Sequence, residues 1–326
     1  MAELSVSAES WPIRGSFRIS RGAKTSADTL RVELRQGGFQ GRGECVPYAR
    51  YGESLDSVTG QIESVRQDIR NGMDRLQLQQ QLPPGAARNA LDCAFWDLQA
   101  KMSRQGVCEL LAVPRMQALT TAYTLSLDSP ANMHRAALEH ADRPLLKLKL
   151  AGEGDIERVR AVRQGAPAAR LIVDANEAWD VGSYRAMLPE LMQLGVEMIE
   201  QPLPAAQDQA LRSLDRPIPI CADESCHASG SLPHIVDRYD MVNIKLDKAG
   251  GLTEALQLRK AAEAGGLQIM VGSMLATSLA MAPAMLLAQG AAIVDLDGPL
   301  LLERDRRPGL RFERSRVFPP PPELWG

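Results

Sequence analysis

Charged residues recur at a regular spacing in the second half of the chain, each at the end of an apolar run. Lys149, Asp174, Glu200, Asp223 and Lys245 follow one another at intervals of 22 to 26 residues. An interval of this size holds about one strand, one helix and two short connections. The carboxyl ends of the strands in a closed (β/α)8 barrel meet on one face. The spacing therefore predicts such a barrel, with five charged side chains pointing at a common centre.

Two lysines stand in the apolar run LLKLKL at 145–150. Because side chains alternate along a strand, Lys147 and Lys149 share one face. A solvated strand face is the ordinary place for such a pair, since unpaired ammonium groups are costly to bury. The acidic residues downstream favour the other interpretation, a charged site in the barrel mouth.

The organisation of the chain changes near residue 115. Before it, β-type stretches are followed by a glycine-rich turn at 37–41 and two helical patterns at 55–72 and 86–104, which predicts an α+β domain over 1–115. The expected stretches are Leu4–Ala8, Phe17–Ile19 and Leu30–Leu34. A barrel is expected over 116–299. The proline-rich tail cannot join a central strand, so we expect residues from about 300 to 326 to return over the N-terminal domain.

Eight apolar runs are the candidates for the barrel strands, and eight strands are what a closed barrel of this type needs. They are Thr120–Leu127, Leu145–Leu150, Leu171–Asn176, Glu197–Pro202, Ile218–Glu224, Met241–Lys248, Leu267–Met274 and Ala292–Pro299.

Composition excludes several classes of partner. The formal net charge is −3, which predicts neither a nucleic-acid footprint nor attraction to an anionic membrane. No apolar run approaches the roughly 20 residues that span a bilayer, and the N-terminus lacks the features of a secretory signal. The five cysteines form no CxxC pair and the four histidines form no HExxH pair. We therefore expect a cytoplasmic protein without a histidine-based zinc site.

Three of the acidic residues predict a metal site. Asp174, Glu200 and Asp223 offer hard oxygen ligands on adjacent strands, a set suited to Mg²⁺. Asn176 faces the same way as Asp174 and is expected to orient a ligand from behind. Glu224 is expected to point to the opposite side and to pair with a lysine or support the site.

Several motifs together resemble a known family. They are Lys147-x-Lys149, DAN at 174–176, EQP at 200–202, ADES at 222–225 and NIKLDKAGG at 243–251. The chain resembles the muconate-lactonizing branch of the enolase superfamily, and within it the L-Ala-D/L-Glu dipeptide epimerases. The match runs from GECVPYARYGES (43–54) and ARNALDCAFWDL (87–98) to DLDGP (295–299). It implies a TIM-like, modified (β/α)7β barrel with an N-terminal α+β capping domain. It also implies an isomerase with one Mg²⁺ per subunit and a possible homo-oligomer.

The two lysines on opposite strands suit a 1,1-proton transfer. Lys149 comes from the second strand and Lys245 from the sixth, so that one can remove an alpha proton and the other can deliver a proton to the opposite face. Mg²⁺ would offset the charge of the enediolate as a Lewis acid. Burial and nearby cations are expected to lower a lysine pKa toward the working range. By resemblance Lys147 assists electrostatically, while Lys248 is expected to face away as a structural residue.

Substrate contacts are expected at the barrel mouth and in the lid loops near Ser20–Thr25 and Cys45–Ser54. By resemblance, Asp295 and Asp297 bind the alpha-ammonium of a dipeptide, although an Asp before Gly298-Pro299 also suits a simple turn. The seventh strand ends without the histidine of sugar-acid dehydratases. The other candidates are Ser273, Met274, Thr124, Arg21, Lys24 and Tyr48.

The leading hypothesis is a Mg²⁺-dependent epimerase of dipeptides such as L-Ala-D/L-Glu, as in peptidoglycan recycling. Its nearest rivals keep the machinery but take another carboxylate: N-acyl amino acid racemisation, o-succinylbenzoate synthesis or lactone cycloisomerisation. A Schiff-base lyase would use one lysine as a nucleophile and need no metal. A non-catalytic barrel would keep these charges without a task.

Overall fold

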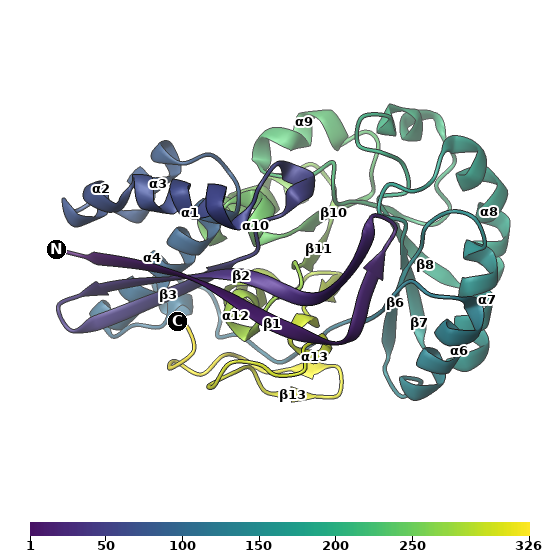
Figure 1. Ribbon diagram of the computed structural model, residues 1–326. Helices are drawn as coiled ribbons and strands as arrows, with labels where there is room; N and C mark the ends of the chain where they lie inside the picture. Colours follow the sequence, from purple (N-terminus) through teal and green to yellow (C-terminus); the bar gives the residue numbers. More distant parts are fainter.

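The N-terminal part of the chain is an antiparallel sheet of long strands. The computed structural model describes residues 1–326, and its strands β1 (Glu3–Ile19), β2 (Gly22–Gln36) and β3 (Phe39–Cys45) pair in the order β1-β2-β3 (Figure 1). Two of the three short stretches expected from the sequence, Leu4–Ala8 and Phe17–Ile19, therefore lie in the single strand β1, and the third lies within β2. β3 was not expected, and it begins within the predicted glycine-rich turn at 37–41. β1 continues past Pro12 because the pairing with β2 shifts register between Pro12 and Phe17 and then resumes. The resulting hairpin reaches from the N-terminal sheet out over the barrel.

Three helices pack against this sheet, α1 (Leu55–Ser64), α2 (Arg66–Arg70) and α4 (Ala86–Ser103). Two shorter ones, α3 (Arg75–Gln81) and α5 (Val107–Leu110), pack against α4. The single helix expected over 55–72 is in fact two, because the chain leaves helical geometry at Val65. α4 lies directly on β3, where a Cβ at Gly41 or Gly43 would come within 2.2 Å of a carbonyl oxygen of the helix. Only glycine allows this close approach.

The second part of the chain is the expected barrel. Its parallel strands are β5 (Tyr123–Leu125), β6 (Leu145–Lys149), β7 (Arg170–Asp174), β8 (Val196–Glu200), β9 (Ile220–Ala222), β10 (Met241–Ile244), β11 (Gln268–Gly272) and β12 (Ile293–Asp295). Each pairs with the next, and the Ala122 N–H donates to the Val294 carbonyl at 2.8 Å between the first and last strands. The predicted fold class is confirmed. The run Thr120–Leu127 is split, since β4 (Leu119–Thr120) belongs to another small sheet.

An outer layer of helices surrounds the strands (Figure 1). It consists of α6 (Pro130–Glu139), α7 (Asp155–Gly165), α8 (Val181–Gln193), α9 (Leu232–Ile235), α11 (Leu252–Ala264) and α12 (Ser278–Leu287). Short 3₁₀ segments occur at η1 (Ala49–Tyr51), η2 (Asp208–Ser213) and η3 (Ser229–Ser231), and the short helices α10 (Leu246–Ala249) and α13 (Gly298–Leu301) follow β10 and β12. After β8, η2 stands where a full helix would complete the repeat.

The barrel interior is layered, and its layers follow from strand alternation. One apolar side chain from each strand region fills the bottom: Ala122, Leu145, Ile172, Met198, Cys221, Met241, Met270 and Ile293. Two residues further along the same faces come polar side chains, among them Lys147, Asp174, Glu200, Asp223 and Asn243, and all of these are buried. The apolar layer thus closes the barrel below, and the polar layer faces the carboxyl ends of the strands.

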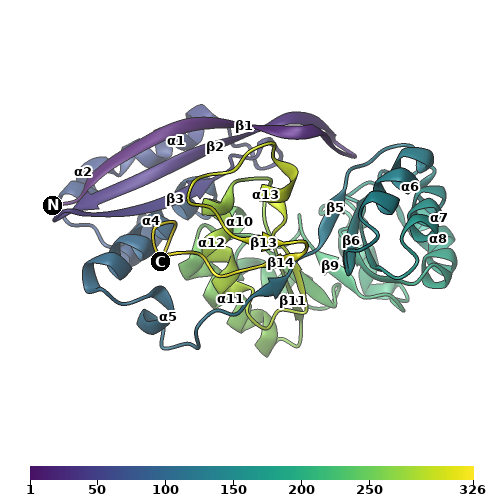
Figure 2. The same cartoon turned by 90° about the horizontal axis from the view of Figure 1, so that it is seen from below.

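The C-terminal segment returns along the N-terminal sheet and helices (Figure 2). It contains β13 (Phe312–Glu313) and β14 (Arg316–Val317), which pair with each other, and β14 also pairs with β4. The Trp325 indole donates to the Cys93 carbonyl of α4 at 2.9 Å, and the Gly326 amide donates to Asp97 at 2.8 Å. The tail therefore ties α4 to the rest of the molecule.

None of the helices combines the length and the apolar character needed to cross a bilayer. All five cysteines are buried and unpaired.

Candidate active site

A cavity of about 500 Å³ opens at the carboxyl ends of the barrel strands, beneath the β1–β2 hairpin and the loop around η1. Ten of the side chains predicted from the sequence line it: Lys149, Asn176, Asp223, Glu224, Lys245, Ser273, Met274, Arg21, Lys24 and Tyr48. The remaining six, Lys147, Asp174, Glu200, Asp295, Asp297 and Thr124, are buried below or behind its wall. The fold therefore gathers residues from all eight barrel strands or their carboxyl ends, and from two N-terminal loops, around one space.

Lys147 and Lys149 lie on the same side of β6, and both meet acidic partners. Lys149 Nζ donates to Asp174 Oδ2 at 2.5 Å, as the register pairing of these two residues between β6 and β7 allows. Lys147 Nζ lies 2.7 Å from Asp295 Oδ2, 2.6 Å from Glu200 Oε2 and 3.4 Å from Asp174 Oδ2. Lys147 is thus surrounded by three carboxylates, while only Lys149 reaches the cavity.

The neighbouring charges set the protonation of Lys147 and of the carboxylates around it. Burial by itself would lower the pKa of Lys147, but Asp295, Glu200 and Asp174 outweigh it and hold the pKa well above its usual value. Burial and Asp174 raise the pKa of Glu200. For Asp174 itself, the effect of burial is overcome by Lys149 and Lys147, so its pKa is lowered. Lys147 therefore acts as a fixed positive charge among these carboxylates.

Lys245 reaches the same cavity from the far side. Its Nζ donates to Asp223 Oδ2 at 2.6 Å. The expectation of a lysine pKa lowered toward neutrality rests on burial together with nearby cations, the metal and Lys147. Burial lowers the pKa of Lys245, but Asp223 and Glu200 raise it more, so the net shift is upward.

Lys248 does not face away, contrary to the expectation. Its Nζ donates to Asp223 Oδ1 and to the Asp223 carbonyl, both at 2.5 Å, and to the Asn243 carbonyl at 3.0 Å. Strand alternation fails here because β10 ends at Ile244 and α10 follows at once. A turn of helix brings residues three apart back to one side. Asp223 is therefore held between two ammonium groups.

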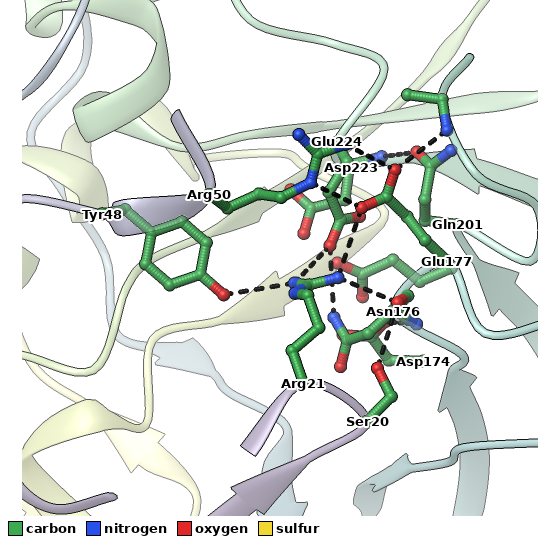
Figure 3. A network of polar contacts seen from close by, with 12 residues as sticks. Ser20, Arg21, Tyr48, Arg50, Asp174, Asn176, Glu177, Gln201, Asp223 and Glu224 are labelled. Atoms are coloured by element: carbon green, nitrogen blue, oxygen red, sulfur yellow. Dashed lines mark hydrogen bonds and ion pairs between the residues drawn. The ribbon is translucent and has the colours of Figure 1, made fainter. Parts of the chain in front are cut away.

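Glu224 also departs from the expected direction. β9 ends at Ala222, so the rule that neighbouring side chains of a strand point to opposite sides does not apply to Asp223 and Glu224. Both residues line the cavity. The partner of Glu224 is an arginine rather than a lysine: Arg21 Nη2 donates to Glu224 Oε1 at 2.7 Å (Figure 3). Burial, with Asp223 and Asp174 nearby, raises the pKa of Glu224 to about 7. The Asn176 amide lies at 3.5 Å from the same carboxylate, and the Asn176 backbone N–H donates to Asp174 Oδ1 at 2.9 Å.

The two aspartates after β12 lie behind the cavity wall. Asp295 Oδ2 accepts from Lys147, and its Oδ1 is buried without a hydrogen-bond partner. Asp297 Oδ2 accepts from the Thr124 backbone N–H at 2.6 Å. Burial and the nearby Asp295 raise the pKa of Asp297 to about 7. The two carboxylates thus contact β5 and β6, and the Asp295 side chain remains 8% exposed.

The carboxylates on β7, β8 and β9 fit a divalent cation in chemistry, although no three acidic, histidine or cysteine side chains are already arranged around one point. Each of the three carboxylates is instead close to a lysine. Lys147 Nζ is near Glu200 Oε2 but is not aligned as a hydrogen-bond donor, so this buried oxygen has no such partner. Buried acceptor oxygens of this kind are suited to Mg²⁺.

Two structural supports of the site were missed by the sequence reasoning. Gln201 Oε1 accepts from the backbone N–H groups of Asp223 and Ser225, at 2.9 and 3.1 Å, so it ties the turn after β9 to the end of β8. Asn243 Nδ2 donates to Glu200 Oε1 at 2.7 Å. Both residues could have been found from the sequence, because each stands close to a predicted site residue. Gln201 follows Glu200 directly, and Asn243 precedes Lys245 by two residues on one strand face.

Two further residues were also missed, Glu177 and Arg50. Arg50, in η1, donates twice to Glu177 in the loop after β7. This pair has no local signal, since the two residues are 127 positions apart in the sequence and meet only through the packing of the N-terminal loops on the barrel.

Comparison with known proteins identifies the family of this chain. The family model "Mandelate racemase / muconate lactonizing enzyme, N-terminal domain" matches residues 1–112, and "Enolase C-terminal domain-like" matches residues 132–320. The L-Ala-D/L-Glu epimerase of Escherichia coli (strain K12) is 46% identical over 97% of this chain and 99% of its own. The N-acetyl-D-glutamate racemase of a Pseudoalteromonas species is 47% identical over 88% of this chain and 92% of its own.

Solved structures show the same likeness. A crystal structure of an enolase family member from Agrobacterium tumefaciens, described as having homology to dipeptide epimerases and holding sodium and L-Ala-L-Glu, is 52% identical with a TM-score of 0.99, and the match covers 100% of both chains. The dipeptide epimerase of Enterococcus faecalis V583, complexed with Mg and L-Leu-L-Tyr, is 28% identical with a TM-score of 0.90, over 98% of this chain and 96% of that one.

The matched relatives are named as epimerases and racemases, which are isomerases, so the expected enzyme class is confirmed. With both family models matched in order along nearly the whole sequence, the chain belongs to the mandelate racemase and muconate lactonizing enzyme family of the enolase superfamily.

Proposed function

We propose that this protein is a Mg²⁺-dependent epimerase of dipeptides such as L-Ala-D/L-Glu, acting by a two-lysine 1,1-proton transfer. One observation carries the proposal: Lys149 from β6 and Lys245 from β10 enter one cavity from opposite sides of the barrel. A carbon atom held between them would be open to proton transfer on both faces. The named activities of the E. coli and E. faecalis relatives support the substrate class.

The residues at the strand ends, which form the floor of the cavity, have separate tasks in this scheme. Asp174, Glu200 and Asp223 would hold Mg²⁺, which when bound stabilises negative charge on the substrate carboxylate as a Lewis acid. Lys149 Nζ removes the alpha proton from one epimer, and Lys245 Nζ donates a proton to the opposite face. The roles are exchanged for the other epimer. Lys147 remains charged and stabilises the developing negative charge. Glu224 and Asn176, which line the cavity beside these carboxylates, would orient the loops that carry the metal ligands.

The ends of the substrate are assigned to different walls. Asp295 and Asp297 would bind the alpha-ammonium of the first residue, which the unpartnered Asp295 Oδ1 supports as a free acceptor. Arg21 and Lys24 would meet an acidic side chain of the second residue. Tyr48, Ser273, Met274 and Thr124 would complete the walls.

We also propose the wider setting of this activity. Residues 1–115, with about 300–326, would act as the capping domain of a catalytic barrel at 116–299. The enzyme would act on peptides released from peptidoglycan in the cytoplasm, and it would do so as a homo-oligomer. Neither a nucleic acid nor a membrane has a part in this scheme.

A second candidate is racemisation of N-acetylglutamate. The 47% identical Pseudoalteromonas enzyme carries this name. Both substrates present a glutamate alpha carbon next to a carboxylate, so the same lysines and metal ligands would serve. They differ at the amino terminus, since an acetyl group brings no positive charge to Asp295 and Asp297.

Proton NMR in D₂O with the Mg²⁺-loaded protein tests both candidates. L-Ala-L-Glu should lose its glutamate alpha-proton signal while the peaks of the diastereomer grow, and EDTA should stop both. Exchange of N-acetyl-L-glutamate alone would favour the second candidate. Exchange of neither compound would refute both, and exchange without inversion would refute the two-lysine mechanism.

A further inference from the structure

Glu177 receives arginines from two separate loops of the N-terminal part of the chain (Figure 3). Arg50, in η1, makes a bidentate pair with it: Nε donates to Oε2 and Nη2 donates to Oε1, both at 2.9 Å. Arg21, in the turn between β1 and β2, contributes Nη1 at 3.4 Å from Oε2. The Ala205 backbone N–H also donates to Oε1, at 2.9 Å. One carboxylate therefore joins both loops to the barrel.

The backbone of the loop after β7 is shaped for this contact. Asn176 and Glu177 both have positive φ angles, 45° and 68°, which are uncommon for residues other than glycine. The Glu177 N–H donates to the Gln201 carbonyl at 2.9 Å, which holds this conformation. The Asn176 carbonyl, in turn, accepts from Arg21 Nη1 at 2.8 Å and from Ser20 Oγ at 3.1 Å. Carbonyl and carboxylate thus face the same N-terminal loops.

Glu177 is not part of the cavity wall, yet it holds a group that is. Its side chain is 10% exposed and is absent from the residues that line the cavity. Arg21, which Glu177 contacts, does line the cavity, and its other guanidinium nitrogen donates to Tyr48 at 3.1 Å and to Glu224 at 2.7 Å. A carboxylate outside the cavity therefore contacts a guanidinium that lines it.

We propose that Glu177 is a positioning residue that fastens both lid loops, 19–25 and 46–54, to the barrel and aims Arg21 at an acidic substrate side chain. The fastening of the loops follows from the contacts of Glu177 alone. The consequence for substrate choice rests on the proposed function. Charge-assisted, bidentate arginine pairs are directional, so a neutral or shorter side chain at this position would not replace the carboxylate.

Hydrogen exchange tests the fastening without any substrate. It is measured on the full chain with Mg²⁺ in excess, for Glu177→Ala and Arg50→Met. Glu177→Ala should raise amide exchange about fivefold in both lid loops, the size expected for a partly exposed ion pair. Arg50→Met should raise it mainly in 46–54, because Arg21 keeps its own contacts. Unchanged exchange in either loop of Glu177→Ala would overturn the proposal.

Glu33→Ala is the matched control. Glu33 also pairs with two arginines, Arg31 and Arg35, and its side chain is also 10% exposed, but it lies within the N-terminal sheet. This variant should leave exchange in both lid loops as in the wild type. Equal loosening of the lid loops in Glu33→Ala and Glu177→Ala would reduce the role of Glu177 to general stability and refute the proposal.

Kinetics then test whether Glu177 orients Arg21 toward an acidic substrate side chain. Glu177→Ala should raise KM for L-Ala-L-Glu about fivefold and change kcat less, while KM for L-Ala-L-Leu stays the same. Equal changes for both dipeptides would overturn the aiming role. If the wild type turns over neither dipeptide, the proposed function fails, whereas the exchange data still decide whether Glu177 fastens the loops.

Discussion

The floor of the cavity is made of strand ends, whereas its roof is made of two loops. The floor side chains are almost fully buried: Lys149 is 10% exposed and Asp174 is 0% exposed. The roof side chains are open to solvent, with Arg21 at 28% and Arg50 at 40% exposed. Both regions are networks of ion pairs between basic and acidic residues. They differ in burial, and burial decides what an ion pair contributes.

Ion pairs in the floor lie where water does not screen them, so the loss of one partner leaves a buried, uncompensated charge. Ion pairs in the roof are screened and adaptable, and each contributes little to stability. A division of labour follows from this difference. Under the proposed function, the floor would fix the atoms that transfer protons, and the roof would select the substrate. Substitutions should therefore have large, general effects in the floor and small, substrate-dependent effects in the roof.

Loss of a floor lysine should have the largest effect. Lys149→Ala and Lys245→Ala should each lower epimerisation of L-Ala-L-Glu by about 10²- to 10⁴-fold, the contribution typical of a general acid or base. In D₂O, each variant should still exchange the alpha proton of the one epimer that faces its remaining lysine. NMR of both epimers measures the two effects in one experiment.

Lys101→Ala is the control for this prediction. It removes a lysine that pairs with Asp97 at 2.7 Å on α4, away from the cavity. Turnover should stay at the wild-type level. Wild-type turnover in Lys149→Ala or Lys245→Ala as well would contradict the idea that the floor transfers the protons.

Removal of a floor carboxylate should be the next largest effect, now on stability. Asp223→Asn leaves two buried ammonium groups, Lys245 and Lys248, without their shared counter-charge. The free energy of unfolding should fall by about 3–5 kcal/mol. Urea unfolding in EDTA measures it. Asp237→Asn breaks an exposed pair with Arg212 and should cost at most about 1 kcal/mol. Equal losses in the two variants would remove the distinction based on burial.

The contact between floor and roof should make the free energy of unfolding depend on pH. Asp247, on α10, accepts from the Val46 N–H of the second lid loop at 3.0 Å, and burial raises the pKa of Asp247 to about 7 from its ordinary 3.8. Between these values the folded protein holds a proton that the unfolded chain has released. The stability linked to this proton is complete below pH 4 and is lost as the pH rises through 7.

Asp247→Asn tests this dependence because an amide resembles the protonated carboxyl. The variant should match the wild type in unfolding free energy near pH 4 and exceed it by on the order of 2–4 kcal/mol above pH 7. The difference between the two proteins isolates Asp247 from other shifted groups such as Asp92, whose pKa burial raises to about 6. A difference that does not change with pH would show that Asp247 is charged in the folded state.

The same contrast explains how far the sequence could predict this site. The floor was predictable because strand alternation places Lys147, Lys149 and the following acidic residues on inward faces. Prediction failed where strands end, since Glu224 lies beyond β9 and Lys248 lies on α10, and alternation does not apply to either. The pairing of Arg50 with Glu177 depends on how the N-terminal loops pack on the barrel, and no local pattern encodes that packing. The direction of most pKa shifts could not be predicted for a related reason, because each depends on all the charges that the fold brings together.

The smallest effects should come from the roof, and they should differ between its two basic residues. Arg21 donates to Asn176, Tyr48 and Glu224, whereas Lys24 has only the face of the Tyr48 ring, 5.7 Å from its Nζ. Arg21→Met should raise KM for L-Ala-L-Glu about tenfold, since charged hydrogen bonds contribute about 1.5–3 kcal/mol. Lys24→Met should raise it about twofold or less. KM for L-Ala-L-Leu, which has no second carboxylate, should not respond to either change. Equal effects of the two substitutions would mean that the roof attracts acidic substrates by its overall charge, and the placement of Arg21 would then have no part in selection.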